Sequence, residues 1–457
     1  MPRLDCGLVR LSRGILFFLI VLTLVTQPAN GYATSVLSDS DLAARDQILL
    51  EDLERRSFQY FWDQTGPRTG LVLDRTSTDG SPSDENHRKV ASIAATGFGL
   101  TALCIAAARH WIKPDDARER VRTTLRFFAN SALQEHGWFY HWLDVDTGER
   151  KWKSEVSSID TALLLAGVLT ARQYFHDDAE IAGLATKIYE RVDFPWMLNR
   201  NPTLLSMGWH PETGFINSRW DDYSEHPILY LMAIGSPTHP ITPQAWYAWK
   251  RNWNHYDGYT YLGKTPLFTY QYSHAWVDFR GRRETKGEHI DYFENSVKAT
   301  LAHRRFCMDL AKDFPAYGPN IWGISASDSI KGYVAWGGPP RDKAIDGTVV
   351  PYAAAGSLMF IPQLAMTALK TMRAKYPQAY GKYGFADAFN PNTGWVNRDV
   401  IGIDLGITLL GAENGRTGNV WRWFMRNPEI PKAMELVELQ KYSRQRRQIR
   451  TQLRKAA

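Results

Sequence analysis

Three loops of this sequence combine aromatic rings with carboxylates in a pattern that could bind and cut a carbohydrate. One runs through residues 208–215 and on to 220–225, a second spans residues 136–142, and the third leads to Trp395. Flat aromatic rings can stack on sugar rings, and a carboxyl group can protonate a glycosidic oxygen or activate a water. Core packing could explain any one of these Trp residues. It explains less well why three Gly-Trp or Gly-Phe turns each lead into acids.

Glu155 is the first candidate for an acid or a base. It precedes the Ser157-Ser158 pair that we expect to start a helix, so helix capping or a dipole contact is the alternative role. Asp160 falls in the first turns of the same helix, next to the apolar run 161–169. A buried Asp must be paired or protonated, so we expect Asp160 to support the site.

Glu225 is the second candidate, because it follows two other acids and leads into the apolar helix 225–234. Burial there would raise its pKa, and neighbouring acids repel unless a base intervenes. We expect Asp222 to position the acids and Arg219 to be that base. Solvation at the surface is the alternative for the acids of this loop.

Further side chains could contact a sugar in the loops between the helices. Asp404 follows the third aromatic loop, and His274 and Asp278 lie in a Tyr-rich loop. We expect substrate contacts from Trp138, Trp142, Trp209, Trp220, His274, Asp278, Trp395 and Asp404. His, Cys and acids form no zinc-ligand or EF-hand motif, so we expect no metal and no cofactor.

Apolar residues at helical spacing recur along nearly the whole chain and predict an all-α fold of about twelve helices. Thr242-Pro243 is a strong start signal for a helix over 243–254, and Pro362 should kink or split a helix over 351–376. Long loops at 135–156, 206–224, 255–288, 315–350 and 383–401 alternate with tight ones. Helical hairpins whose long loops gather at one end are what an (α/α)6 toroid requires.

The ends of the chain differ from its body. Residues 1–33 read as a secretory signal, with a basic start and an apolar run, although an uncleaved anchor is the alternative. Of the net charge of +6, these residues carry +2 and the basic tail 439–457 carries +7, which leaves about −3 for residues 34–438. We therefore expect a periplasmic or secreted single domain at 34–438 that binds no nucleic acid and has no membrane span beyond the signal. Cys104 and Cys307 should be buried free thiols.

Several motifs resemble the bacterial glucoamylase-like family, glycoside hydrolase family 144, which includes the endo-β-1,2-glucanases. The resemblance covers residues 45–430 and rests on Glu155–Gly167, Trp220–Glu225, Gly235–Pro237, Pro266–Asp278, Asp346–Pro351 and Gly402–Ile407. It implies an (α/α)6 toroid that hydrolyses β-1,2-linked glucose chains with inversion and without a metal. It also implies that Glu155 and Glu225 are the catalytic carboxyl groups, without deciding which is the acid.

We therefore expect a glycoside hydrolase whose partner is a glucan or an oligosaccharide. One alternative is the same fold acting on another β-glucan or oligosaccharide, cut from chain ends. The other is a glycan-binding envelope protein without turnover, against which the carboxylate pair argues. The sequence leaves endo or exo action and the oligomeric state open.

Overall fold

The computed structural model describes residues 44–263 and 266–442. The chain divides into two compact units, Met1–Ser35 and Val36–Ala457, and every described residue belongs to the second unit. The expected signal segment and most of the expected basic tail therefore lie outside the described residues. Among the residues that are described, no helix is both long enough and apolar enough to span a membrane.

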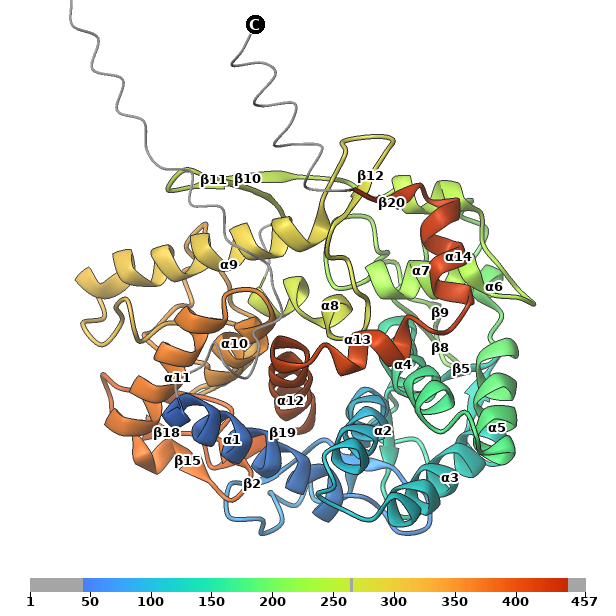
Figure 1. Ribbon diagram of the computed structural model, residues 1–457, viewed down its shortest axis with the longest axis horizontal. Coiled ribbons are helices and arrows are strands. Elements are labelled where there is room, and N and C mark those ends of the chain that lie inside the picture. Colours follow the sequence, from blue (N-terminus) through green and yellow to red (C-terminus); the bar gives the residue numbers. More distant parts are fainter. Residues whose placement is uncertain (1–43, 264–265, 443–457) are drawn as a thin grey trace, which may run out of the picture. The chain divides into compact units, whose positions relative to one another are not determined.

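Helices make up most of the regular structure (Figure 1). The described residues contain fourteen α-helices, slightly more than the sequence predicts, because short helices such as α6 and α8 carry little periodic signal. They are α1 Ala44–Asp63, α2 Ile93–Ala108, α3 Pro114–Asn130, α4 Ser158–Tyr174, α5 Ala179–Glu190, α6 Phe194–Leu198, α7 Pro227–Gly235, α8 Tyr272–Trp276, α9 Tyr292–Asp309, α10 Pro351–Ala355, α11 Pro362–Lys375, α12 Gly402–Arg416, α13 Asn419–Phe424 and α14 Glu429–Leu436.

Helices α2 and α4 cross at two glycines. A Cβ atom on Gly97 would lie 2.2 Å from the Leu163 carbonyl oxygen, and one on Gly167 would lie 2.1 Å from the carbonyl oxygen of Gly97. No other residue type fits this approach, which explains the small residues that line α2. Helix α3 packs against α2 and α5 against α4, so consecutive helices form hairpins with α2 and α4 toward the middle of the unit (Figure 1).

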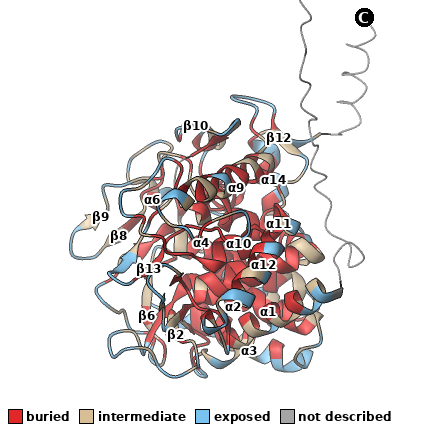
Figure 2. Cartoon of the chain, turned by 90° about the vertical axis from the view of Figure 1, so that its left-hand side faces the viewer, coloured by how far each residue is buried: buried red, intermediate tan, exposed pale blue. Residues whose placement is uncertain are grey.

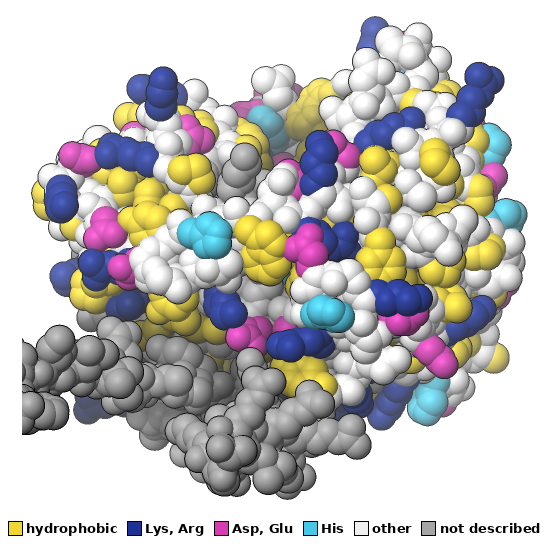
Figure 3. Space-filling view, turned by 90° about the horizontal axis from the view of Figure 1, so that it is seen from above, with side chains coloured by type: hydrophobic (Ala, Val, Ile, Leu, Met, Phe, Trp, Pro, Cys, Tyr) yellow, Lys and Arg dark blue, Asp and Glu magenta, His cyan; other side chains and the backbone are white. Residues whose placement is uncertain are grey.

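The core lies between these helices, and exposed residues are concentrated in the loops and on the outer helix faces (Figure 2). Cys104 on α2 and Cys307 on α9 are both buried free thiols, as expected. Pro362 begins α11 and separates it from α10 and the 3-10 turn Gly356–Met359, which confirms the predicted split. On the face seen in Figure 3, basic and acidic side chains lie interspersed among hydrophobic and other residues.

Short strands occupy the long loops and hold them against one another. Two sheets have three strands, in the orders β1-β3-β6 and β7-β8-β9. Their bounds are β1 Val72–Leu73, β3 Val90–Ser92, β6 Trp142–Asp144, β7 Val156–Ser157, β8 Gly208–His210 and β9 Gly214–Phe215.

The other strands form antiparallel pairs. These pairs are β2 Arg75–Ser77 with β19 Asp399–Ile401, β4 Gln134–Glu135 with β5 Trp138–Phe139, β10 Trp253–Tyr256 with β11 Tyr259–Leu262, β12 Arg282–Glu284 with β20 Leu439–Lys441, β13 Ser327–Ser329 with β14 Gly332–Val334, β15 Tyr380–Gly381 with β16 Gly384–Phe385, and β17 Phe389–Asn390 with β18 Trp395–Val396.

The helix predicted over 243–254 is wrong beyond its first turn. Thr242-Pro243 does start a helix, but only the 3-10 turn Pro243–Tyr247 forms, and β10 follows it. Asp257 and Gly258 connect β10 to β11 with φ angles of 45° and 81°. An Asp-Gly pair between alternating residues is a hairpin signal, and here it overrides the helix.

Candidate active site

Glu155 is held by backbone contacts on both edges of β7, the strand that follows it. Val156 pairs with Trp209 of β8 on one edge and forms a bridge to Tyr140 on the other. The Glu155 carbonyl oxygen accepts a hydrogen bond of 2.9 Å from the His141 amide. The carboxyl group is thereby fixed where the chain enters α4.

His141 joins Glu155 to Asp160. Its Nδ1 lies 2.8 Å from Glu155 Oε1, and its Nε2 lies 3.4 Å from Asp160 Oδ1. Burial would lower the pKa of His141, but the two carboxylates outweigh burial and raise it. Burial would likewise raise the pKa of Glu155, but the hydrogen bond and charge of His141 lower it. Glu155 is therefore held in its ionised form.

Asp160 also closes the N-terminus of α4. Ser157 is the N-cap residue, and its Oγ accepts from the Asp160 amide and donates to Asp160 Oδ2 at 2.5 Å. The remaining oxygen of Asp160 is the one that faces His141. The capping role weighed for Glu155 thus belongs to Ser157 and Asp160, which leaves Glu155 outside the helix.

Glu225 lies two residues before α7 and is only 9% exposed. Its carbonyl oxygen accepts from Ser273 Oγ at 2.6 Å, and Ser224 Oγ donates to its carboxyl group. Burial raises the pKa of Glu225, and the charge of Asp160 raises it further. Glu225 therefore tends to keep its proton at a pH where Glu155 has lost its own.

A pocket of about 190 Å³ is lined by residues that neighbour the segments of both acids. Its wall includes Ser224, the neighbour of Glu225. It also includes Met207, the neighbour of Gly208, and Gly208 lies close to the Glu155 side chain. The residues that line it are Met207, Arg219, Trp220, Asp221, Asp222, Tyr223, Ser224 and Gly263. The loop 220–225 that the sequence singles out therefore forms most of this pocket.

The acids of this loop have their own partners, and these correct the role expected for Arg219. Its guanidinium donates to the carbonyl oxygens of Leu198 and Leu204, at 2.9 and 2.7 Å, and so braces the loop backbone. Asp221 pairs with Lys250 at 2.9 Å, and Asp222 accepts from Asn252 at 2.6 Å. The base beside the acids is thus a lysine that lies 29 residues further along the chain.

The aromatic residues fall into two groups. Trp142, Trp209 and Trp395 are half-buried, as stacking residues need to be. Trp138 is completely buried, and its indole donates to the Asp193 carbonyl oxygen, so its expected contact with substrate is wrong. Trp220 lines the pocket but is 5% exposed, and its indole donates to Ser158 Oγ at 2.9 Å. Trp220 is therefore a packed wall of the pocket.

His274 and Asp278 lie away from this pocket. His274 is buried in α8 among Phe279, Phe293 and Phe360, and burial lowers its pKa to about 3. It is a core residue, because the expected loop is partly helical here. The Asp278 carboxylate forms a two-point pair with Arg280 at 2.8 and 2.9 Å. That local pair balances the charge of Asp278, whose contact with substrate stays a prediction, whereas the contact predicted for the buried His274 is wrong.

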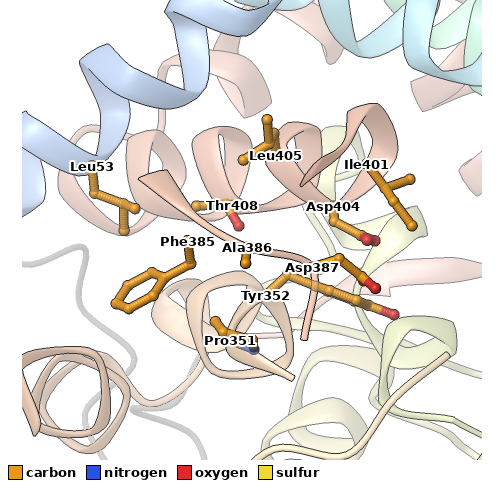
Figure 4. A pocket seen from close by; sticks show the side chains of 10 residues that line it. All are labelled: Leu53, Pro351, Tyr352, Phe385, Ala386, Asp387, Ile401, Asp404, Leu405 and Thr408. Carbon is orange, nitrogen blue, oxygen red and sulfur yellow. The ribbon is translucent and has the colours of Figure 1, made fainter. Parts of the chain in front are cut away.

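Asp404 belongs to a second group of acids (Figure 4). It lies in the first turn of α12, and its carboxyl group forms a hydrogen bond with that of Asp387. Both residues line a cavity of about 10 Å³. Burial raises the pKa of both groups. The charge of Asp328 raises the pKa of Asp387 further, and the charge of Asp387 does the same for Asp404, so the pair retains a proton. Asp387 also accepts from Asn397 at 3.0 Å and from the Asp328 amide at 2.8 Å.

Acids of both groups raise the pKa of one tyrosine, Tyr272. Burial raises the pKa of Tyr272 in α8, and the charges of Asp404, Glu225 and Asp160 raise it further. Sequence reasoning missed Asp387 and His141. A carboxyl between two small residues, Ala386-Asp387-Ala388, is the signal that could have indicated the first of these.

One cluster could also offer ligands to a cation. Ligand atoms of His141, Glu155 and Asp160 all lie within 4.8 Å of one another. A protonated imidazole between two carboxylates satisfies the same charges without a metal. The geometry fits both arrangements, and they differ in their response to a chelator.

The chain is similar to known carbohydrate-active proteins. Residues 217–428 match a protein family described as "Putative glucoamylase". An exo β-1,2-glucooligosaccharide sophorohydrolase (non-reducing end) of Parabacteroides distasonis is 26% identical over an alignment of 432 residues, which covers 86% of this chain. The chain spans 58% of the length of that curated relative.

Solved structures extend the similarity over the fold. A glucoamylase of Hormoconis resinae, at a TM-score of 0.51 and 10% identity over 83% of this chain and 75% of its own, shares the fold alone. An endo-β-1,2-glucanase of Chitinophaga pinensis superposes with a TM-score of 0.80 and 30% identity, over 87% of this chain and 99% of the other. An identity of this size over nearly the whole of that enzyme shows that the chain belongs to the glucoamylase-like family of β-1,2-glucan hydrolases, glycoside hydrolase family 144.

Proposed function

We propose that this protein hydrolyses β-1,2-linked glucan by acid–base catalysis, with Glu225 as the acid and Glu155 as the base. The observation that carries the proposal is the opposite shift of the pKa values of two carboxyl groups that Asp160 connects. Asp160 faces His141, the partner of Glu155, and its charge raises the pKa of Glu225. An enzyme that cuts a glycosidic bond needs one protonated and one ionised carboxyl group at the same pH. The β-1,2-glucan specificity of the Chitinophaga and Parabacteroides relatives supports the substrate.

In the proposed reaction, Glu225 gives its proton to the glycosidic oxygen as the bond to the anomeric carbon breaks. Glu155 takes a proton from a water that attacks the anomeric carbon from the opposite face, so the product is inverted. His141 stabilises the ionised state of Glu155 before the reaction. Trp142, Trp209 and Trp395 have the partial exposure that contact with sugar rings needs.

The proposal includes an (α/α)6 toroid as the architecture of the described unit. The hairpins α2–α3 and α4–α5, each with an inner and an outer helix, support it, as does the likeness to the Hormoconis glucoamylase. Long loops on such a frame would bring Glu155 and Glu225 together from separate hairpins. We also propose export to the periplasm or the medium, with residues 1–33 as the signal, which N-terminal sequencing of the exported protein would test.

The substrate is tested by incubating the protein with linear β-1,2-glucan, starch, laminarin and cellulose, and identifying the sugars released. Cleavage of β-1,2-glucan to α-anomeric products, read by NMR at early times, is expected. Sophorose as the sole product would indicate exo action, as in the Parabacteroides relative, and a mixture of lengths would indicate endo action. Activity on starch alone would overturn the proposal, and binding without turnover would favour the glycan-binding alternative.

The rate should depend on pH in a bell shape. At low pH, protonation of Glu155 removes the base, and because its pKa is lowered this fall should begin below the ordinary glutamate range. At high pH, Glu225 loses its proton, and because its pKa is raised the fall should come above that range. Measuring kcat/KM against pH, with the melting temperature followed in parallel, tests this. A rate that keeps rising through neutral pH would contradict Glu225 as the acid.

Removal of divalent cations should leave the initial rate within about twofold of its original value, because His141 already balances the charges of Glu155 and Asp160. The measurement is the rate after dialysis against EDTA, with untreated protein as the control. Loss of activity that Ca²⁺, Mn²⁺ or Zn²⁺ restores would show instead that these three side chains bind a metal.

A further inference from the structure

We propose that Trp152, together with Trp142, forms an additional subsite that binds a glucose unit of the substrate on the far side of Glu155 from the 190 Å³ pocket. This inference rests on the proposed function and extends it. The Val156 residue of strand β7 pairs with β8 on one edge and with Tyr140, two residues before Trp142, on the other. The substrate chain would cross the carboxyl groups and continue over the two indole rings.

Aromatic contacts connect Trp152 to the candidate catalytic group. The Trp142 ring stacks on His141, with centroids 3.9 Å apart and planes at 16°. The ring centroids of Trp152 and Trp142 lie 5.7 Å apart, with the planes at 67°. His141 in turn forms a hydrogen bond with Glu155. Trp152 also meets the His87 ring edge-on at 5.2 Å, and the residue still remains 48% exposed. It is therefore placed to contact something beyond the protein.

The backbone at Trp152 adopts a conformation that bulky residues avoid. Trp152 has φ of 53° and Lys153 has φ of 48°, in the left-handed region that glycine occupies most easily. Burial of the indole does not compensate for this strain, since half of the residue stays exposed. Strained backbone that persists at an exposed position indicates a functional constraint.

The strained turn is braced by Arg150. Its guanidinium donates to the carbonyl oxygens of Ser154 and Lys153, each at 2.6 Å, and pairs with Glu212 at 2.6 Å. It also lies 4.9 Å from the centre of the Tyr140 ring. The turn is thus tied to the β8–β9 hairpin, which fixes the exposed indole relative to Glu155.

The chemistry of this surface fits a neutral sugar chain. Two indoles at 67° to each other present faces in different directions. A β-1,2-linked chain bends at each linkage, so neighbouring glucose rings also turn their faces in different directions. Stacking on such rings holds the ground state and the transition state alike, so the subsite should act on KM and on the preference for longer chains.

The test compares W152A, W152G and W152F with wild type on β-1,2-gluco-oligosaccharides of increasing length. Trp253, 46% exposed on β10, gives the matched control W253A for loss of an exposed indole. For long substrates we expect W152A and W152G to raise KM about tenfold with kcat within about twofold, W152F to recover most of the loss, and W253A to match wild type. The shortest substrate that is cleaved should show no change. W152G should melt no lower than wild type, because glycine relieves the strain.

Different failures have different meanings. If wild type cleaves no β-1,2-glucan, the proposed function fails and the subsite fails with it. If wild type cleaves β-1,2-glucan and W152A and W152G show unchanged KM at every length, only the subsite is overturned. A fall in kcat with unchanged KM would also overturn it, because Trp152 would then act through His141 and not by binding sugar.

Discussion

Replacing Glu225 by Gln should lower kcat on β-1,2-glucan by roughly 10³-fold, about 4 kcal/mol of activation free energy, while the protein keeps its fold. The amide has nearly the shape of the carboxyl group and can still accept from Ser224, but it has no proton to give to the leaving oxygen. Circular dichroism and melting temperature check the fold, and initial rates at saturating substrate give kcat.

The role of Glu225 as the acid can be separated from a general loss of activity. A substrate with a dinitrophenol leaving group needs no proton donor, so E225Q should cleave such a sophoroside at close to the wild-type rate. The variant E180Q serves as the control. It removes an exposed carboxylate on α5 that pairs with Arg126 of α3. A loss of less than about tenfold on glucan, about 1.4 kcal/mol, would remove Glu225 from the mechanism.

Replacing Glu155 by Gln should cause a loss of similar size, again roughly 10³-fold in kcat, because an amide cannot take a proton from the attacking water. Here the dinitrophenyl substrate should not restore the rate, since the missing step is the activation of water. Added azide, which needs no base, should restore turnover and give an α-glycosyl azide if the enzyme inverts.

The contrast between the two variants is the decisive result. If E155Q is rescued by the good leaving group and E225Q by azide, the two roles are exchanged. If neither the dinitrophenyl substrate nor azide restores the rate of either variant, the two side chains act by keeping the site in shape. The variant H141N would then lower kcat to the same degree as E155Q, because His141 connects Glu155 to Asp160.

The sequence predicts the helical frame well because the frame depends on local periodicity. The apolar run of α2, the acids in the first turn of α3 and Pro362 at the start of α11 each carry a signal within a few residues. The hairpin at Asp257-Gly258 also had a local signal, which the stronger start at Thr242-Pro243 obscured.

The site is predictable in part, for a related reason. Glu155 and Glu225 stand out as acids at helix starts, and the structure connects both to Asp160, which lies 3.4 Å from His141 and raises the pKa of Glu225. The contacts that set their pKa values join residues that lie far apart in sequence or in separate elements. His141 reaches Glu155 and Asp160 from another loop, and Asp387 meets Asp404, which lies 17 residues further along the chain, beyond three short strands. Trp138 and His274 mislead because a ring in an aromatic-rich segment looks the same in a core as in a binding site.

The glycine crossing of α2 and α4 connects the packing of the core to the alignment of the site. Gly97 lies in the second turn of α2, whose N-cap residue Ser92 pairs with Trp142. Helix α4 begins directly after the short strand β7 that follows Glu155. A methyl group at either glycine would meet a carbonyl oxygen at little more than 2 Å and force the two helices apart. The two helix starts would then carry Trp142 and Glu155 away from each other, and a displacement of about 1 Å can cost about 10²-fold in rate. In this fold, two buried glycines that do not contact the substrate set the distance between Trp142 and Glu155.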